Sequence, residues 1–225
     1  MMKIDWTMPK YRQEEHIPFI PDEKNLDLLV ASSHSKRMTA YLKCLKDTLA
    51  DPGEALKIRW CDVSGDIVTI NFPVKGHRPR QIQVTPQLIA MLNSLPKTSE
   101  RIFPVKYSSI FRCYSKLRIR AAALHHDPNI RKIELRSFRH WGATEIAYST
   151  TNNINGVLVA MKILGHKQIT STMKYIGNIA YKEEDYDVEA ATTVEEATKL
   201  LKAGFKYEVD MLGTKLFKRP TRFSS

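Results

Sequence analysis

One strand–turn–strand segment, set between helical stretches, constrains the fold of this chain most strongly. Residues 66–72 (DIVTINF) and 80–84 (RQIQV) alternate apolar and polar side chains, as strands with one buried face do. The linking segment PVKGHRPR contains a glycine and predicts a β-hairpin with a basic tip. On both sides of this hairpin, apolar residues recur every three or four positions, which is the helical period. We therefore expect a mainly α fold of the α+β class, with a small antiparallel β-sheet.

The helical stretches have clear start and stop signals. A proline and two acids at residues 21–23 begin the first helix, and Thr85 with Pro86 caps and begins TPQLIAMLNSL. Gly165 is placed to end another helix in a left-handed conformation. Apolar spacing predicts further helices at residues 36–50, 54–60, 108–123, 137–148, 156–164 and 168–176.

The chain divides into three expected parts. Residues 1–20 are polar with two prolines and predict a tether, and residues 21–180 predict one folded domain. Residues 181–225 begin acidic and end in an alternating segment about Leu212 and Gly213, which predicts a C-terminal tail of one helix plus a β-hairpin. The hydrophobic content of 43% is high enough for a packed core.

Targeting and cysteine patterns indicate a cytoplasmic protein. No run approaches the ~20 apolar residues of a membrane span, and the N-terminal sequence lacks the apolar core of a signal peptide. The three cysteines are far apart and form no CxxC pair, which favours reduced thiols over disulfides or a zinc site: Cys44, Cys61 and Cys113. We expect no cofactor and no membrane partner.

Charge is the informative bulk property. The chain holds 35 Lys and Arg against 24 Asp and Glu, a net charge of +11. Such a balance indicates a polyanionic partner, most often a nucleic acid, although a merely basic enzyme would look the same.

Two short motifs carry groups suited to phosphate chemistry. In LGHKQITSTMKYIG, Tyr175 follows His166 by nine positions and comes directly after Lys174. Upstream, Arg136 and Arg139 in LRSFRH are three residues apart, so both side chains can share one helical face and hold an anion between them. Each motif also has an ordinary interpretation: the tyrosine could simply pack, and the arginines could be solvated or paired with nearby glutamates.

The hairpin tip adds a third basic cluster. Lys75 stands beside a glycine, and three further basic residues follow within five positions: His77, Arg78 and Arg80. Such a loop could fold over an anionic ligand, although most loop lysines have no specific role. His140, next to Arg139, is a further candidate DNA-binding residue, as is Lys174.

The order of these motifs resembles the catalytic domain of the tyrosine recombinases, the phage-type integrases. The resemblance covers about Pro18 to Gly177 and comprises GEALKIRW, a hairpin lysine, LRSFRH, LGH and a tyrosine nine residues after that histidine. The C-terminal fifth looks like a tail found in integrases of archaea and their viruses. The family's N-terminal DNA-clamping domain has no counterpart here, so we expect a catalytic domain alone.

The resemblance implies a reaction and a role for each residue. Tyr175 would attack the scissile DNA phosphate and form a covalent 3′-phosphotyrosine link, with no metal or ATP consumed. Arg139 resembles the second phosphate-clamping arginine, and His166 resembles a histidine that hydrogen-bonds the phosphate. Lys75 resembles the lysine that protonates the leaving 5′-oxygen, and Arg136 takes the place of the first residue of the HxxR motif. The implied partners are duplex DNA and other recombinase subunits.

Two positions depart from this pattern: Arg136 replaces the histidine of HxxR, and a more serious departure is at Asp51. Asp51 stands where the family's first arginine is expected, in TLADPGEAL. A carboxylate there would repel the phosphate unless Arg59 or Arg37 enters from elsewhere, or unless Asp51 caps the helix after it. Elsewhere the carboxylates do not cluster near the basic motifs in the sequence. We predict a site-specific recombinase; the alternatives are an impaired DNA-binding module of the same fold and a topoisomerase-like nicking and closing enzyme.

Overall fold

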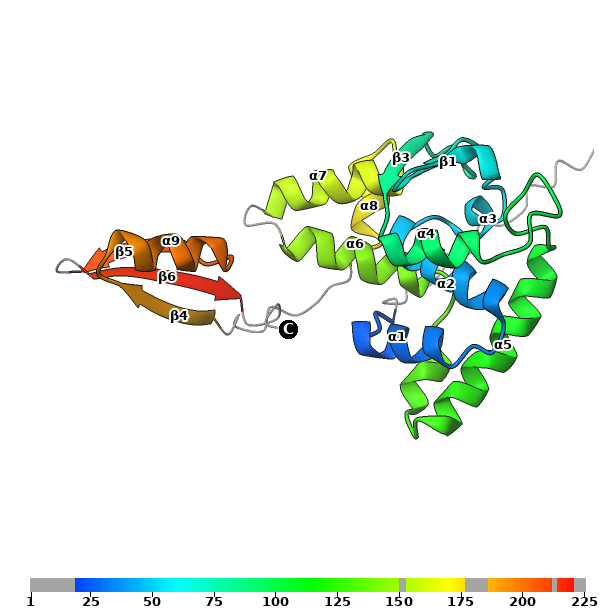
Figure 1. The fold of residues 1–225 in the computed structure, drawn as a ribbon, viewed down its shortest axis with the longest axis horizontal. Coiled ribbons are helices and arrows are strands. Elements are labelled where there is room, and N and C mark those ends of the chain that lie inside the picture. Colours follow the sequence, from blue (N-terminus) through cyan, green and yellow to red (C-terminus); the bar gives the residue numbers. More distant parts are fainter. Residues whose placement is uncertain (1–18, 150–152, 177–185, 212–213, 221–225) are drawn as a thin grey trace, which may run out of the picture. The chain divides into compact units, whose positions relative to one another are not determined.

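The computed structural model describes residues 19–149, 153–176, 186–211 and 214–220 (Figure 1). The chain separates into two compact units, residues 1–177 and residues 178–225, which are described one at a time. Most of the predicted tether lies outside the described residues. No helix in the described part of the chain is long and apolar enough to cross a membrane.

The first unit is mainly helical with one small sheet, as predicted (Figure 1). Its elements, in chain order, are α1 (Glu23–Ala31), α2 (Lys36–Thr48), α3 (Pro52–Ala55), η1 (Trp60–Asp62), β1 (Val63–Ser64), β2 (Ile67–Ile70), β3 (Arg80–Gln83), α4 (Pro86–Asn93), α5 (Tyr107–Leu124), η2 (Pro128–Lys132), α6 (Ser137–Ser149), α7 (Asn153–Leu164) and α8 (Ile169–Met173).

The predicted hairpin is present, and a short third strand extends it. β2 and β3 pair antiparallel with Val68 opposite Ile82, and β1 adds to the free edge of β2 in the order β1-β2-β3. Burial alternates along β3, from buried Arg80 to exposed Gln81, which is the period-two pattern that predicted the strand. Two-residue β1 was not expected because it is too short to show a period.

Helix α2 runs through the core of this unit. Its apolar residues recur at three- and four-residue spacing, so one face is buried throughout: Met38, Tyr41, Leu42 and Leu45. The Tyr41 hydroxyl donates to the Pro52 carbonyl 2.9 Å away, which satisfies the only polar atom of that buried ring. This contact fixes the start of α3 against α2.

The end of α2 lies unusually close to α6. Leu49, the C-cap of α2, adopts a left-handed conformation with φ of 50°. A Cβ on Gly142 of α6 would stand 2.2 Å from a Leu49 methyl carbon, so a larger residue would have to displace the Leu49 side chain. The contact brings the Leu49 carbonyl next to α6, where the candidate site uses it.

Three predicted helices have clearly different bounds, and one of them, expected at residues 156–164, is α7 and begins at Asn153. The helix expected at residues 54–60 instead begins at Pro52 and ends at Ala55, because Asp51 caps it two residues earlier. The helix expected at residues 168–176 is the five-residue α8. Thr85 and Gly165 behave as predicted: Thr85 accepts a hydrogen bond from the Leu88 N–H, and Gly165 has φ of +71° at the end of α7.

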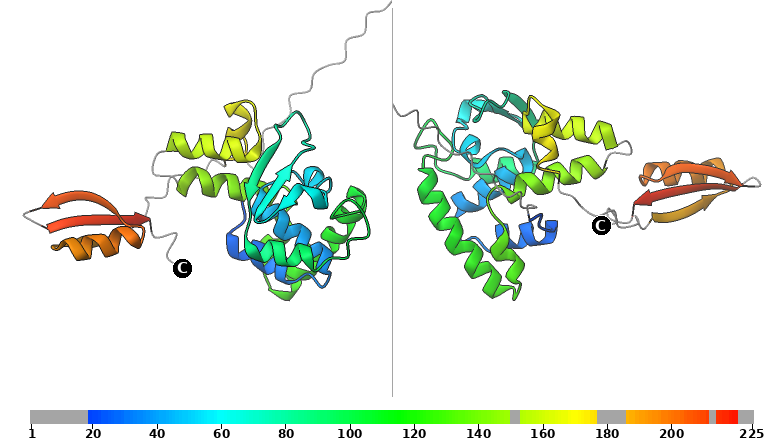
Figure 2. Two further views of the ribbon diagram at one scale, coloured as in Figure 1. Left: turned by 45° about the horizontal axis from the view of Figure 1, so that its top comes forward. Right: turned by 180° about the vertical axis from the view of Figure 1, so that it is seen from behind.

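The second unit is a three-stranded antiparallel sheet with one helix. Its elements are β4 (Tyr186–Ala191), α9 (Val194–Lys202), β5 (Lys206–Met211) and β6 (Thr214–Pro220), in sheet order β4-β6-β5 (Figure 2). The helix covers one face of the sheet through a small core of Ala191, Phe205 and Phe217. The helix and the hairpin were expected, whereas β4 was not, because its partner β6 lies more than twenty residues away.

Charge is divided unevenly between the two units. Residues 178–225 hold 8 Lys and Arg against 9 Asp and Glu, which leaves 27 and 15 of the chain's 35 and 24 in residues 1–177. The net positive charge therefore belongs to the first unit.

Candidate functional site

Arg139 of α6 is the buried centre of the site. Its side chain is only 1% exposed, and its two terminal nitrogens donate to the carbonyls of Leu49, 2.5 Å away, and Leu164, 2.7 Å away. One guanidinium therefore ties the ends of α2 and α7 to α6. Its Nε is buried and has no hydrogen-bond partner in the described part of the chain.

His166 contacts the same guanidinium. Its Nε2 lies 3.1 Å from Arg139 Nη2, and its Nδ1 lies 3.0 Å from Thr172 Oγ1. Because arginine can only donate, Nε2 must accept, so the proton is on Nδ1 and is donated to Thr172. Burial, together with the positive charge of Arg139, lowers the His166 pKa to about 4, and the ring is neutral near pH 7.

Tyr175 lies over this cluster, so the structure brings the predicted nucleophile to the predicted phosphate-binding residues. Its ring centroid is 5.3 Å from the Arg139 guanidinium carbon and 5.2 Å from the centroid of the His166 ring. The tyrosine is half-buried and packs against Leu164 and the end of α2, while its N–H donates to the Thr172 carbonyl.

His140 stacks on the ring of Tyr175. The two ring centroids are 4.4 Å apart with an interplanar angle of 22°, and His140 also hydrogen-bonds the Tyr175 backbone. Burial and the charges of Arg139 and Arg136 lower the His140 pKa. His140 was predicted as a DNA-binding residue; the structure places it against Tyr175.

Asp51 does two things at once. It caps α3, accepting from the Gly53 N–H at 3.0 Å, while Glu54 reaches back to the Asp51 N–H in a capping box. Its second oxygen, Oδ2, lies 3.6 Å from Lys75 Nζ and 3.9 Å from Arg136 Nε, without a hydrogen bond. The structural interpretation of Asp51 as a helix cap is therefore correct, and its carboxylate still faces two of the predicted catalytic cations.

Lys75 stands on a tightly held turn. It adopts φ of +52°, which is rare for a residue with a side chain, next to Gly76 at +72°. Glu54 holds the turn from both ends, accepting from the Val74 N–H at 3.3 Å and from His77 Nδ1 at 2.7 Å. The turn is thus fixed to the start of α3, while the Lys75 side chain remains 55% exposed.

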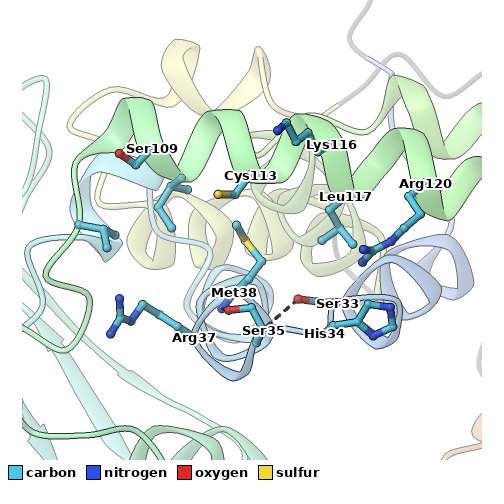
Figure 3. A pocket seen from close by; sticks show the side chains of 12 residues that line it. Ser33, His34, Ser35, Arg37, Met38, Ser109, Cys113, Lys116, Leu117 and Arg120 are labelled. Atoms are coloured by element: carbon cyan, nitrogen blue, oxygen red, sulfur yellow. Dashed lines mark hydrogen bonds between the residues drawn. The ribbon is translucent and has the colours of Figure 1, made fainter.

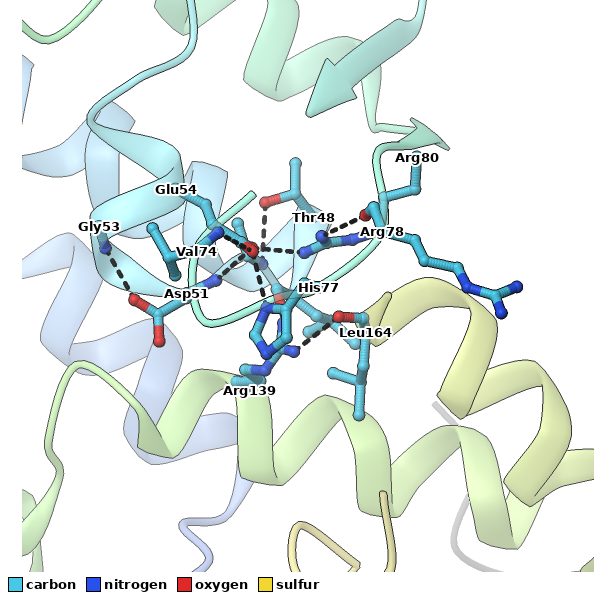
Figure 4. A network of polar contacts seen from close by, with 12 residues as sticks. Thr48, Asp51, Gly53, Glu54, Val74, His77, Arg78, Arg80, Arg139 and Leu164 are labelled. Carbon is cyan, nitrogen blue, oxygen red and sulfur yellow. Dashed lines mark hydrogen bonds and ion pairs between the residues drawn. The ribbon is translucent and has the colours of Figure 1, made fainter. Parts of the chain in front are cut away.

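Glu54 is the hub of this polar network (Figure 4). It is 1% exposed and accepts a further bond of 2.6 Å from Arg80 Nη2. Burial alone would raise the Glu54 pKa, but the hydrogen bonds and charge of Arg80, with help from the Asp51 N–H and His77, lower it to about 2. Glu54 is therefore a buried carboxylate that stays ionised.

The four basic residues of the hairpin do not all face solvent. Arg80 and His77 turn inward to Glu54, so only Lys75 and Arg78 of the expected basic cluster keep exposed side chains, and Lys75 lies 3.6 Å from Asp51. Arg78 is exposed and turns away from the network (Figure 4), and its N–H donates to the Gly165 carbonyl at 2.8 Å. Lys174, beside Tyr175, is also exposed.

The sequence analysis placed Asp51 next to the phosphate site but missed Glu54. Asp51 and Glu54 lie among the basic residues, so the expectation that acids stay away from the basic motifs is wrong. Their signal was available, because Asp51-x-x-Glu54 before an apolar run is a capping box. Arg59 does not replace the missing arginine: it pairs with Asp62 at 3.4 Å and Glu100 at 3.0 Å.

Comparison with known proteins identifies the fold. The sequence matches no protein-family model and no curated protein. Solved structures do match: the XerA recombinase (TM-score 0.59, 18% identity, 89% of this chain and 68% of that one) and the catalytic domain of bacteriophage HP1 integrase (0.52, 22%, 70% and 86%). The fold is that of a tyrosine recombinase catalytic domain.

A lambda integrase dimer bound to a COC′ core site has the same recombinase fold, with a TM-score of 0.56 at 12% identity. The match covers 77% of this chain but 52% of lambda integrase, so the chain spans about half of that protein. These identities are low and extend to the fold alone. The predicted fold class is confirmed.

Proposed function

We propose that this chain is the catalytic part of a site-specific DNA recombinase that cuts and rejoins DNA through Tyr175. The observation that carries the proposal is the position of Tyr175, whose ring lies on Arg139 and contacts His166. A phenol held beside a guanidinium is suited to attack a phosphate that the guanidinium stabilises. The basic first unit and its fold support DNA as the substrate.

The proposed chemistry needs only groups of the protein and DNA. The Tyr175 oxygen attacks the phosphorus, the bond to the 5′-oxygen breaks, and the phenolic proton passes to solvent or a nearby base. Lys75 donates a proton to the leaving 5′-oxygen. Attack by a 5′-hydroxyl then reverses the step and restores the phosphodiester, so no energy source is consumed.

Several hydrogen bonds and ion pairs in the candidate site would have to change when DNA binds. The terminal nitrogens of Arg139 give three of their N–H groups to two carbonyls and His166, so one Nη1–H and the buried Nε–H have no partner in the described part of the chain. His166 would donate from Nε2 to a phosphate only after releasing Arg139. On the open side, a phosphate entering between Lys75 and Arg136 would take over contacts that Asp51 now makes.

The position of the Asp51 carboxylate favours a second candidate function. Its carboxylate stands next to the two cations and weakens their attraction for a phosphate. The alternative is therefore a DNA-binding module that keeps the fold without cleavage.

The proposal has two further parts. The chain assembles with other recombinase subunits, and its tail resembles that of archaeal and viral integrases.

The test is covalent capture of DNA. The chain is incubated with a pool of nicked suicide duplexes, and a denaturing gel detects a DNA–protein adduct. We expect an adduct with the native chain and none with Tyr175→Phe, which should still bind DNA because only the nucleophilic oxygen is lost. Peptide mapping to Tyr181 or Tyr186 would overturn the assignment; DNA binding without any adduct would favour the non-enzymatic module.

A further inference from the structure

A second basic pocket lies away from the candidate site. It is a cavity of about 330 Å³ between α5 on one side and the connection from α1 to α2 on the other (Figure 3). That volume is within the range of small-ligand sites, about 300–1,000 Å³. None of the residues described so far in the candidate site lines it.

The pocket is positively charged without compensation. Its lining includes Arg37 of α2 and Lys116 and Arg120 of α5, and it includes no aspartate or glutamate. Arg120 donates to the Ser32 carbonyl at 2.8 Å, and none of the three cations makes an ion pair with a described carboxylate. Three like charges border one cavity, so an anion bound in it would be attracted to all of them.

The rest of the lining indicates a phosphate attached to a larger body. Hydroxyl groups of Ser33, Ser35 and Ser109 border the pocket. Ser33 donates to the Ser35 carbonyl 3.4 Å away (Figure 3), and the hydroxyls of Ser35 and Ser109 can donate to phosphate oxygens. Its floor is apolar, formed by side chains that include Met38, Ile110 and Leu117. A bare inorganic anion would leave this floor unused, whereas a sugar attached to the phosphate would cover it.

The pocket also has a defined distance from the candidate site. Helix α2 connects them: Arg37 stands in its first turn, and Leu49, which binds Arg139, caps its end. Twelve residues of α-helix span about 18 Å. This distance is several times the spacing of phosphates along a DNA strand, about 3.4 Å, so a phosphate bound in the pocket would not be the one that Tyr175 attacks.

We infer that this pocket binds a phosphate ester, either a backbone phosphate of DNA away from the cleavage point or a free mononucleotide. The DNA form of this inference rests on the proposed function; the binding chemistry of the pocket does not. A bound backbone phosphate would fix the position of the duplex relative to Tyr175 without reading its sequence.

The two exposed cysteines provide the experiment. Cys113 lines the pocket, whereas Cys61 lies in η1 outside it and serves as the internal control. The full chain is alkylated with a small maleimide, alone, with duplex DNA, and with thymidine monophosphate. Mass spectrometry then follows each cysteine. We expect ligand to slow alkylation of Cys113 several-fold and to leave Cys61 unchanged.

A charge variant tests the cations themselves. Arg37→Gln with Lys116→Gln should lose the protection of Cys113 and lower the slope of log affinity for DNA against log salt by about one. The matched control is Lys24→Gln with Arg131→Gln, which removes two exposed charges outside the pocket. The control should protect Cys113 like the native chain.

Each outcome decides the inference. Protection by DNA alone assigns a backbone phosphate, and protection by thymidine monophosphate assigns a free mononucleotide. No protection by either ligand, or equal protection in the charge variant, overturns it. If the chain binds no DNA at all, the proposed function fails, and thymidine monophosphate still tests the pocket.

Discussion

Arg139 and Lys75 carry the same charge within one site, yet the protein holds them in opposite ways. Arg139 is 1% exposed, and its terminal nitrogens are all engaged by backbone carbonyls and His166. Lys75 is 55% exposed, and its nearest anion, Asp51, lies at 3.6 Å without a hydrogen bond. The first cation supports the fold as well as the site, whereas the second is free to respond to a ligand.

Glu54 connects these two sides. It holds the Lys75 turn through Val74 and His77, and it contacts Arg80, whose charge in turn acts on Arg139 and His166. The Lys75 side chain is therefore exposed to solvent, whereas Glu54 holds its backbone in place. Because the backbone of the Lys75 turn is already in place, less of the site must rearrange when a phosphate binds.

The largest expected effects come from replacing each cation. Arg139→Lys and Lys75→Gln should both slow adduct formation by about 10²–10³, the usual cost of removing one aligned donor. Only Arg139→Lys should also destabilise the fold, by roughly 1–3 kcal/mol, because lysine cannot serve two carbonyls in a fixed fork. Suicide-substrate kinetics and denaturant unfolding of the same samples measure the two quantities.

The difference between Arg139 and Lys75 can be disproved by the stability of the two variants. A Lys75→Gln protein that unfolds as easily as Arg139→Lys would show that Lys75 is structural too. Lys75→Arg is the matched control, since it keeps the positive charge and changes only the proton donor. It should retain DNA binding and lose cleavage, because arginine does not release a proton near neutral pH.

The next effect concerns Glu54, which joins the two sides. Its pKa of about 2 in the folded chain lies below its usual 4.5, a difference worth about 3 kcal/mol. That stability is fully present above pH 4.5 and is lost as the pH falls toward 2. Glu54→Gln should therefore lower stability at pH 7 and flatten its dependence on pH between 5 and 2. Unfolding curves across this range check the prediction, and Glu100→Gln, at an exposed position, is the control.

Much of this arrangement could be predicted from the sequence, because it follows from local patterns. The spacing of apolar residues located α2 and α5, and motif order placed Tyr175 with Arg139 and His166. The burial of Arg139 could not be predicted, since it depends on carbonyls of Leu49 and Leu164 from distant segments. Strand β4 was missed for the same reason: its identity depends on pairing with β6.

A smaller effect, of opposite sign, is expected at Asp51. Asp51→Asn keeps the cap, because asparagine caps helices about as well as aspartate, but it removes the charge beside Lys75 and Arg136. We expect adduct formation to rise about tenfold at unchanged stability. Asp51→Ala removes charge and cap together and should cost about 1 kcal/mol of stability. A slower Asp51→Asn protein would mean that the carboxylate assists the reaction, for example by orienting Lys75.

The smallest expected effect is on the pKa of His166, which reports on the buried region around Arg139 alone. Burial and the adjacent Arg139 charge lower the His166 pKa to about 4, against about 6.5 for an unstrained histidine. Because the folded chain favours the neutral ring, this contribution to stability is present above pH 6.5 and is lost as the pH falls through 4.

Nitrogen chemical shifts of His166 should show a neutral ring protonated on Nδ1 at pH 7. Phosphate contact would require Nε2 to leave Arg139 and become a donor, so a DNA complex should raise this midpoint. A His166 titration midpoint near pH 6.5 in the free chain would instead show that Arg139 and His166 are already apart. The region around Arg139 would then be as open to a ligand as the region around Lys75.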